Sequence, residues 1–276
     1  MTVAIVGLGL IGGSLAKAFS ERTAHQVIGF DRNPEVTQAA LTSGAIQKVG
    51  EPADLSQADL IYLCVYPHAA VQFVKEQHPF FKKEVVVTDT SGIKTEICEE
   101  LSSLARTHGF VFAGSHPMAG KEQSGFWASE AGLFDGASYL LVPCGAPEGA
   151  LALLSETALQ LGFGGVKRTT PEEHDRMIAF TSQLPHALAC AYVLSPQCPR
   201  HKGFSAGSYR DVSRVARINE ELWSELFLEN REPLTAEMDE LIRHLEGIRA
   251  AIQNNDRDAL RDILRCGRQI KEALDE

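Results

Sequence analysis

His116 and Pro117 stand side by side in a segment bracketed by Gly114, Gly120 and Gly125. Glycine permits sharp backbone turns, proline fixes the backbone just after the histidine, and imidazole exchanges a proton near neutral pH. The segment follows an apolar run, so we expect a loop that presents His116 as a general base. A His-Pro pair alone is more often a structural turn than a catalytic base, and the choice depends on the rest of the chain.

A second histidine follows a proline inside a stretch that is otherwise helical in pattern. Residues 171–194 read as one helix that contains Ser182, Pro185 and His186. An interior proline removes a backbone hydrogen bond and bends a helix. The polar neighbours favour a shaped pocket, although a kinked core helix with a hydrogen-bonded histidine would have the same sequence pattern.

Positive charge gathers locally in a chain that is acidic overall. Residues 207–217 contain Arg210, Arg214 and Arg217, whereas the whole chain has 26 Lys and Arg against 36 Asp and Glu. A guanidinium group offers a planar fork of donors that matches a carboxylate. The cluster predicts a carboxylate ligand at Arg214. Pairing with surface acids near residue 220 is the alternative, which we favour for Arg217.

Two more polar segments lie where ligand contacts are common. Residues 88–94, Thr-Asp-Thr-Ser-Gly-Ile-Lys, follow an apolar strand, and the carboxyl ends of parallel strands line ligand crevices. His174 and Asp175 stand one turn into the first C-terminal helix. This pair could orient an interdomain cleft, and plain helix capping and packing is at least as good an interpretation.

The N-terminus carries a dinucleotide-binding pattern in the correct context. Residues 3–16 form a strand, a Gly-x-Gly-x-x-Gly turn and the start of a helix. In such a turn the first glycine permits the tight bend, the second lets the backbone approach a pyrophosphate, and the third lets the helix pack on the strand. The predicted cofactor-binding residues of the turn are Gly7, Gly9, Leu10, Ile11 and Gly12.

A second strand, residues 26–30, ends at an acid that strengthens this prediction. Asp31 can accept hydrogen bonds from ribose hydroxyls and would repel a 2'-phosphate. NAD is therefore the expected cofactor and NADP is less favoured. Arg32 is a further cofactor-binding candidate, because a neighbouring arginine can accommodate that phosphate.

The elements that must position these side chains divide into two groups. Short apolar runs alternate with helix-length segments up to about residue 168, which is typical of a mostly parallel sheet covered by helices on both faces. From Thr170, a plausible N-cap followed by proline and two acids, the pattern is helical almost to the end. We predict an α/β fold with a Rossmann-type domain over residues 1–168 and an all-α domain over 169–276. The predicted strands are 3–6, 26–30, 60–65, 84–88, 110–113 and 139–142.

One long C-terminal helix carries an apolar stripe. The stripe could pack inside its own domain or against a second copy of the chain. Residues 254–256, Asn-Asn-Asp, then interrupt the pattern and can cap a last helix. The stripe consists of Leu234, Met238, Leu241, Leu245, Ile248 and Ile252.

Composition excludes several classes of protein. The chain of 276 residues is 44% hydrophobic and 22% charged, which is ordinary for a globular protein, and a net charge of -10 argues against a general nucleic-acid or anionic-membrane surface. No apolar run approaches the length of a membrane span, and no cleavable leader precedes the first strand. The six cysteines form no CxxC pair or Cys/His cluster, so we expect no disulfide framework, no zinc site and a cytoplasmic location.

With these segments in place, the chain resembles the prephenate and arogenate dehydrogenase family of tyrosine biosynthesis, in its monofunctional form. The resemblance runs through nearly the whole length. It rests on GLGLIGGSLA, DTSGIK, GSHPMAGKEQSG, EEHDRMIAFTSQLPHALA, and SYRDVSRVA followed by Trp223 and LFLEN.

The resemblance implies NAD-dependent oxidative decarboxylation of a cyclohexadienol, in which hydride and carbon dioxide leave and the ring becomes aromatic. His116 would take the hydroxyl proton, His186 in the SQLPH segment that begins at Ser182 would contact the substrate, and Arg214 would pair with a substrate carboxylate. Glu122, Arg210 and Asp211 would form a polar network at the pocket rim. A homodimer through the C-terminal helices is expected from the family, with a small-molecule substrate and no nucleic acid or membrane partner.

Two positions bear on what is specific to this chain. Many family members place a serine where this chain has Gly92, and Ser91 is the candidate that could support His116 instead. Prephenate carries a pyruvyl side chain and arogenate an amino acid, so an acid near that side chain would favour the ammonium group of arogenate. Glu221 is the candidate by resemblance to arogenate-using relatives, and an exposed helix acid is an equal alternative.

Two other functions are compatible with parts of the pattern. One is another Rossmann dehydrogenase with a helical C-terminal domain, such as a hydroxyacid dehydrogenase or an imine reductase. The other is a binding protein that senses NAD and has no catalytic activity. The sensor hypothesis predicts NAD binding without turnover.

Overall fold

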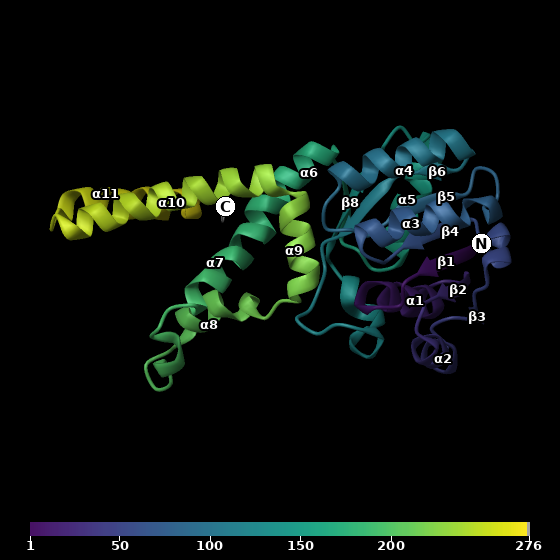
Figure 1. Ribbon diagram of the computed structural model, residues 1–276, viewed down its shortest axis with the longest axis horizontal. Coiled ribbons are helices and arrows are strands. Elements are labelled where there is room, and N and C mark those ends of the chain that lie inside the picture. Colours follow the sequence, from purple (N-terminus) through teal and green to yellow (C-terminus); the bar gives the residue numbers. More distant parts are fainter. Residues whose placement is uncertain (275–276) are drawn as a thin grey trace.

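A six-stranded parallel sheet forms the centre of the first half of the chain in the computed structural model, which describes residues 1–274 (Figure 1). The strand order is β3-β2-β1-β4-β5-β6, so the chain runs outward in both directions from β1. This order places the topological switch point between β1 and β4, which is where open α/β sheets bind ligands. The strands are β1 Thr2–Val6, β2 Gln26–Phe30, β3 Lys48–Val49, β4 Leu60–Leu63, β5 Val86–Asp89 and β6 Val111–Phe112.

Helices cover both faces of this sheet because every inner strand is apolar on both sides. Val3 and Ile5 of β1 pack into one core with α1, α2 and α5, while Ala4 and Val6 pack into a second core with α3 and α4. The predicted parallel, doubly covered sheet is confirmed. The helices are α1 Leu10–Arg22, α2 Pro34–Thr42, α3 Pro67–Gln77, α4 Thr95–His108 and α5 Glu148–Gln160.

A second sheet of three strands corrects two sequence predictions. Its order is β7-β8-β9, with β7 Gly114–Pro117, β8 Ser138–Val142 and β9 Gly165–Arg168. The predicted strand at 139–142 is therefore outside the main sheet, and β7 begins where a loop was expected. His116 lies on a strand because β7 pairs antiparallel with β8, opposite Leu140. That partner is distant in sequence, so the local glycines and proline gave no sign of it.

The helical part begins as predicted and then departs from a single bent helix. Thr170 caps α6, Pro171–Ile178, by accepting a hydrogen bond from the Glu173 amide at 3.2 Å. A π-helical turn over Ala179–Gln183 then joins it to α7, Leu184–Val193. Wider i to i+5 turns of this kind are frequent at functional sites. This one accommodates the position of Pro185 without breaking the run.

Four α-helices follow α7 in the described residues, and the last two form a long antiparallel hairpin that projects away from the sheets (Figure 1). Asp256 caps the last helix, as expected, by accepting from the Ala259 amide at 3.0 Å. Within residues 1–274 no helix is long and apolar enough to cross a membrane. The remaining helices are α8 Gly207–Ser213, α9 Glu220–Glu229, α10 Arg231–Gln253 and α11 Arg257–Leu274.

The predicted apolar stripe lies on α10 and packs only in part inside the chain. Leu234 is buried, whereas the exposed fraction rises to 49% at Leu245 and 61% at Ile252. Packing within one chain therefore accounts for Leu234 and in part for Leu241 and Ile248, and it leaves Met238, Leu245 and Ile252 exposed.

Candidate active site

The glycine turn after β1 has the geometry that a dinucleotide requires. Gly7 adopts φ +89°, and a Cβ there would lie 2.5 Å from the Cys64 carbonyl oxygen. A Cβ on Gly12 would lie 1.9 Å from the Gly7 carbonyl oxygen, whereas one on Gly9 would meet no heavy atom within 4 Å. Gly9 also begins α1 without any side-chain cap. Leu10 and Ile11 form the first turn, so an open helix N-terminus is available to bind pyrophosphate.

Asp31 lies directly after β2, beside this turn. Its carboxylate accepts hydrogen bonds from the Leu8 amide at 2.9 Å and the Asn33 amide at 2.8 Å. These bonds fix its orientation and leave acceptor capacity for ribose hydroxyls, since each carboxylate oxygen has two lone pairs. Arg32 is exposed next to it. The residues around the turn therefore fit NAD.

His116 is held close to the carboxyl end of the parallel sheet by its neighbour Ser115. The Ser115 amide donates to Asp89 Oδ1 at 3.2 Å, and the Ser115 hydroxyl donates to the Asp89 carbonyl oxygen at 2.5 Å. Asp89 is the last residue of β5. The two sheets are thus joined at the edge where α/β folds bind ligands.

A chain of hydrogen bonds leads from His116 into the helical part. The Nδ1 atom of His116 lies 2.9 Å from Nε2 of His174, and the Nδ1 atom of His174 lies 2.7 Å from Oδ1 of Asp175. The carboxylate also accepts from the amides of Lys94 and Thr95, both at 2.8 Å. Asp175 therefore caps the N-terminus of α4 and holds the histidine pair at the same time.

This chain of bonds assigns the tautomers. An ionised carboxylate only accepts, so His174 carries its proton on Nδ1 and accepts through Nε2. His116 must then donate from Nδ1, which leaves its Nε2 as the basic atom. Within residues 1–274, Nε2 has no hydrogen-bond partner. The arrangement extends the logic of an aspartate that orients a catalytic histidine.

The electrostatics keep this base neutral. Burial, followed by electrostatic interactions with His174 and Lys94, lowers the pKa of His116 well below its ordinary value. Burial also lowers the pKa of His174, against the opposing pull of Asp175. For Asp175, burial works to raise the pKa, but hydrogen bonds from His174, Thr95 and Lys94 hold the pKa below its usual value. The pair is neutral and the acid ionised at physiological pH.

A buried ion pair stabilises the loop between β5 and α4, next to His116. Lys94 Nζ pairs with Asp89 Oδ2, and both side chains are fully buried. The same aspartate accepts from the Ser91 amide at 2.8 Å. Removing either charge alone would leave the other buried and uncompensated, which is strongly destabilising. The pair therefore fixes the loop between β5 and α4.

Ser91 does not take the place of the serine expected at Gly92. Its hydroxyl is buried and has no hydrogen-bond partner within residues 1–274, and the Nδ1 atom of His116 is bonded to His174 instead. A Cβ on Gly92 would meet only the Leu226 methyl groups, at 3.6 Å, an ordinary contact. Position 92 therefore has room for a larger residue, and His174 supports the base.

The predicted substrate-side residues form two groups. His186 stacks on the Trp223 ring of α9, with centroids 3.8 Å apart, and its Nδ1 donates to the Ser182 carbonyl oxygen at 2.8 Å. Arg214 pairs with Glu122 at 2.5 Å. Glu122 lies in the segment after β7, so this pair brings residues 207–217 over the loop that follows His116.

The two groups are linked electrostatically. Burial is the main cause that lowers the pKa of His186, and the charge of Arg214 lowers it further. The pKa of Glu122 is lowered by its own backbone amide and by Arg214. Arg210 is exposed on α8, and Glu221 is exposed in the first turn of α9, two residues before Trp223.

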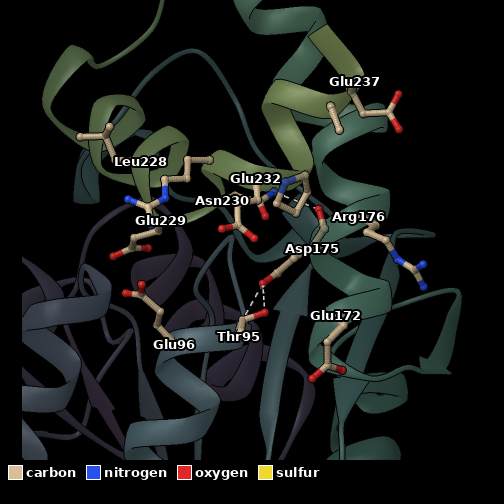
Figure 2. Close-up of a pocket in the computed structure, with 13 residues that line it drawn as sticks. Thr95, Glu96, Glu172, Asp175, Arg176, Leu228, Glu229, Asn230, Glu232 and Glu237 are labelled. Atoms are coloured by element: carbon tan, nitrogen blue, oxygen red, sulfur yellow. Dashed lines mark hydrogen bonds between the residues drawn. The ribbon is translucent and has the colours of Figure 1, made fainter. Parts of the chain in front are cut away.

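A polar cavity of about 790 Å³ opens on the other side of Asp175, between α4, α6 and the α9–α10 junction (Figure 2). Acidic side chains dominate its lining, and Figure 2 shows the carboxylates of Glu96 and Glu229 facing one another. The lining contains none of the predicted catalytic, substrate or cofactor residues. Asn230, also in the lining, donates to the Asp175 carbonyl oxygen at 2.9 Å and to Gln183 at 2.6 Å.

The sequence reasoning missed the role of the His174–Asp175 pair and of the Asp89–Lys94 pair. Both were noticed as polar residues at useful places. A signal for the first was the adjacent histidine and aspartate beside an N-cap, and a signal for the second was an acid and a lysine at the two ends of a loop after a buried strand. Neither signal identifies the partner across the fold.

Comparisons with known proteins agree with this architecture. The sequence profile described as the prephenate dehydrogenase nucleotide-binding domain matches residues 15–174, and the one described as the prephenate dehydrogenase dimerization domain matches residues 170–266. A cyclohexadienyl dehydrogenase from Zymomonas mobilis is 31% identical over 283 residues, covering 99% of this chain and 95% of that protein.

Two solved structures extend the similarity to the fold. The arogenate dehydrogenase of Synechocystis superposes with a TM-score of 0.84 at 28% identity, over 99% of this chain and 100% of the other. The prephenate dehydrogenase of Aquifex aeolicus, solved with hydroxyphenyl propionate and NAD+, superposes with a TM-score of 0.88 at 26% identity, over 100% and 98% of the two chains. The chain described here belongs to the prephenate dehydrogenase family.

Proposed function

We propose that this protein is an NAD-dependent dehydrogenase of tyrosine biosynthesis that oxidises and decarboxylates prephenate, arogenate or both. The products are 4-hydroxyphenylpyruvate from prephenate and tyrosine from arogenate, each with carbon dioxide and NADH. The observation that carries the proposal is the hydrogen-bonded series Asp175–His174–His116, which leaves Nε2 of His116 as a neutral base. Membership of the family supports the reaction class.

His116 takes the proton of the ring hydroxyl as hydride leaves the same carbon. The resulting imidazolium keeps its Nδ1 proton in the bond to His174, and the Asp175 charge stabilises it from behind. NAD, when bound, supplies the hydride acceptor. Loss of carbon dioxide leaves its bonding electron pair in the ring, which becomes aromatic, so the protein's main task is alignment and proton removal.

The substrate-binding roles follow from the second group of residues. Arg214 is the partner for a substrate carboxylate, with Glu122 holding the guanidinium until substrate arrives. His186, fixed by Trp223 and the Ser182 carbonyl oxygen, forms another wall of the pocket. Arg210 belongs to the rim. Glu221 would favour the ammonium group of arogenate over the keto group of prephenate.

Asp31 supports a preference for NAD over NADP. Its carboxylate is held by two backbone amides beside the glycine turn, where a 2'-phosphate would bring like charge close. The exposed Arg32 is the group that could offset that repulsion.

We further propose a homodimer formed through the C-terminal helices, with the division between the two domains at residues 168 and 169. The exposed stripe on α10 supports the dimer, because Met238, Leu245 and Ile252 are uncovered within one chain. The match to a dimerization domain over residues 170–266 points to the same region.

All six cysteines are free, which is consistent with a reducing cytoplasm.

The deciding experiment follows NADH formation with prephenate and arogenate side by side. Turnover of at least one substrate is expected, and His116→Asn should lower kcat by about 10²- to 10⁴-fold, the usual effect of removing a general base. NAD affinity should stay nearly constant in that variant. NAD binding without turnover of either substrate would instead identify a sensor and overturn the proposal.

A further inference from the structure

Three side chains from the two parts of the molecule converge outside the catalytic region. His68 is the second residue of α3, and Glu225 and Glu229 lie one turn apart on α9. Each offers one ligand atom, and these atoms all lie within 4.8 Å of one another. The cluster therefore bridges the sheet-containing part and the helical part.

The carboxylates of this cluster are buried without adequate partners. The side chain of Glu229 is only 8% exposed, and its carboxylate makes no hydrogen bond within residues 1–274; the nearest nitrogen of a basic side chain among these residues is His68 Nε2, 3.8 Å away. Oε1 of Glu225 is also buried and has no hydrogen-bond partner among the described residues. Buried carboxylates normally carry partners, because leaving them unpaired is costly.

The surroundings add negative charge. Glu96 of α4 faces Glu229 across the cavity of Figure 2, and Asp175 lies in the same lining. The geometry thus combines two under-satisfied carboxylates with one imidazole and leaves a site that a cation would complete.

We propose that His68, Glu225 and Glu229 form a binding site for one divalent transition-metal ion, of which Zn²⁺ is the representative. Imidazole with carboxylates suits zinc and its neighbours better than magnesium, which prefers all-oxygen octahedral sites. Ligands on one tetrahedral zinc ion lie about 3.4 Å apart, given bonds of about 2.1 Å. The 76% exposed side chain of His68 can close the small remaining gap by a change of rotamer.

The ion links the sheet-containing part to the helical part, because its ligands come from α3 and α9. Glu229 adjoins Asn230, which donates to the Asp175 carbonyl oxygen. A bound ion would therefore also stabilise the segment that holds His174. The inference does not depend on the proposed function, since it concerns binding and stability. It also goes beyond the expectation of no zinc site, which rested on cysteine and histidine spacing in the sequence.

The test uses the full-length protein freed of metal with a chelator. Calorimetric titration with Zn²⁺ should show one ion per chain, and saturating Zn²⁺ should raise Tm by about 5 °C, whereas Mg²⁺ at the same concentration should do neither. His68→Ala and Glu225→Gln should each weaken Zn²⁺ binding at least tenfold. Their Tm without metal should stay close to that of the wild type, which verifies folding.

A matched control separates this site from adventitious binding. His78 follows the other end of the same helix and stacks on His108 at 3.6 Å, so it forms a second surface histidine site. His78→Ala should leave the titration unchanged. X-ray absorption of the bound ion should show nitrogen and oxygen neighbours and no sulfur. Unchanged affinity in His68→Ala and Glu225→Gln, sulfur ligation by a cysteine, or no binding at all would each overturn the proposal.

Discussion

His174 accepts the Nδ1 proton of His116 across 2.9 Å and so determines which nitrogen of this proposed general base is basic. His116 lies on strand β7, and His174 lies on helix α6. The strands therefore hold the backbone of His116, and the helical part of the molecule orients its ring.

Removing His174 should impair catalysis without removing the base. We expect His174→Ala to lower kcat about 10- to 100-fold with little change in KM, because His116 loses its orientation and preferred tautomer. His174→Gln should recover part of the rate, since an amide oxygen can accept the Nδ1 proton. Steady-state kinetics of both variants test this. A kcat within twofold of the wild type in His174→Ala would exclude the support role.

The lowered pKa of His116 predicts the acid side of the pH profile. Its ordinary value is about 6.5, and burial, His174 and Lys94 place the pKa well below that. We expect kcat/KM to hold its neutral-pH value as the pH falls through about 6.5 and to decline only at lower pH. An acid limb centred above pH 6.5 would contradict the assignment of His116 as the buried base.

The same shift predicts how stability depends on pH. Because the pKa is lower in the folded protein than in the unfolded chain, the unfolded chain takes up its proton first as the pH falls. The contribution is therefore constant above about pH 6.5, and the free energy of unfolding falls below it by up to about 1.4 kcal/mol per pH unit for this group. Urea unfolding at pH 7.5 and 5.5 should show a smaller loss in His116→Asn than in the wild type.

The Arg214–Glu122 pair predicts opposite effects on substrate affinity. Arg214→Ala should raise KM about 10- to 100-fold because the substrate carboxylate loses its partner, whereas Glu122→Gln should lower KM severalfold because a competing carboxylate is gone. Arg168→Ala is the matched control, since Arg168 forms a comparable exposed pair with Glu148. Equal KM in all three variants would show that the substrate carboxylate binds to a residue other than Arg214.

Glu221 predicts the choice of substrate. Glu221→Gln should shift the ratio of kcat/KM toward prephenate, because the neutral amide no longer attracts the ammonium group of arogenate. Glu220→Gln, a change in the same exposed turn, should leave the ratio unchanged. If Glu221→Gln also leaves the ratio unchanged, Glu221 has no part in specificity.

Asp31 predicts the choice of cofactor. Asp31→Asn removes the charge while keeping one oxygen acceptor for the Leu8 or Asn33 amide. The ratio of kcat/KM with NAD to that with NADP should fall at least tenfold. Glu35→Gln, at the exposed first turn of α2, should not change it. A constant ratio in Asp31→Asn would assign cofactor choice to another residue.

Features that depend on neighbouring residues could be predicted from the sequence. The glycine turn, the acid after β2 and the Thr170 cap each express a backbone or hydrogen-bonding requirement within a few positions. The strand character of residues 114–117 could not, because it comes from pairing with 139–142.

The hydrogen-bond partner of His116 could not be predicted from the sequence for the same reason. Nothing near residue 116 specifies that an imidazole from α6 will lie beside it. Ser91 was the candidate because it is close in sequence to the expected position, yet the fold leaves its hydroxyl without a partner.

The two duties of Asp175 set a rule for making chimeras within the family. Asp175 belongs to the helical half, yet its carboxylate caps the N-terminus of α4, a helix that belongs to the sheet half. A crossover placed between β9 and α6 would bring a foreign Asp175 against a native Thr95. Such hybrids should be active only when both parents place this carboxylate against the same backbone amides of residues 94 and 95. The activity of a hybrid would therefore measure whether this contact between the two halves has formed.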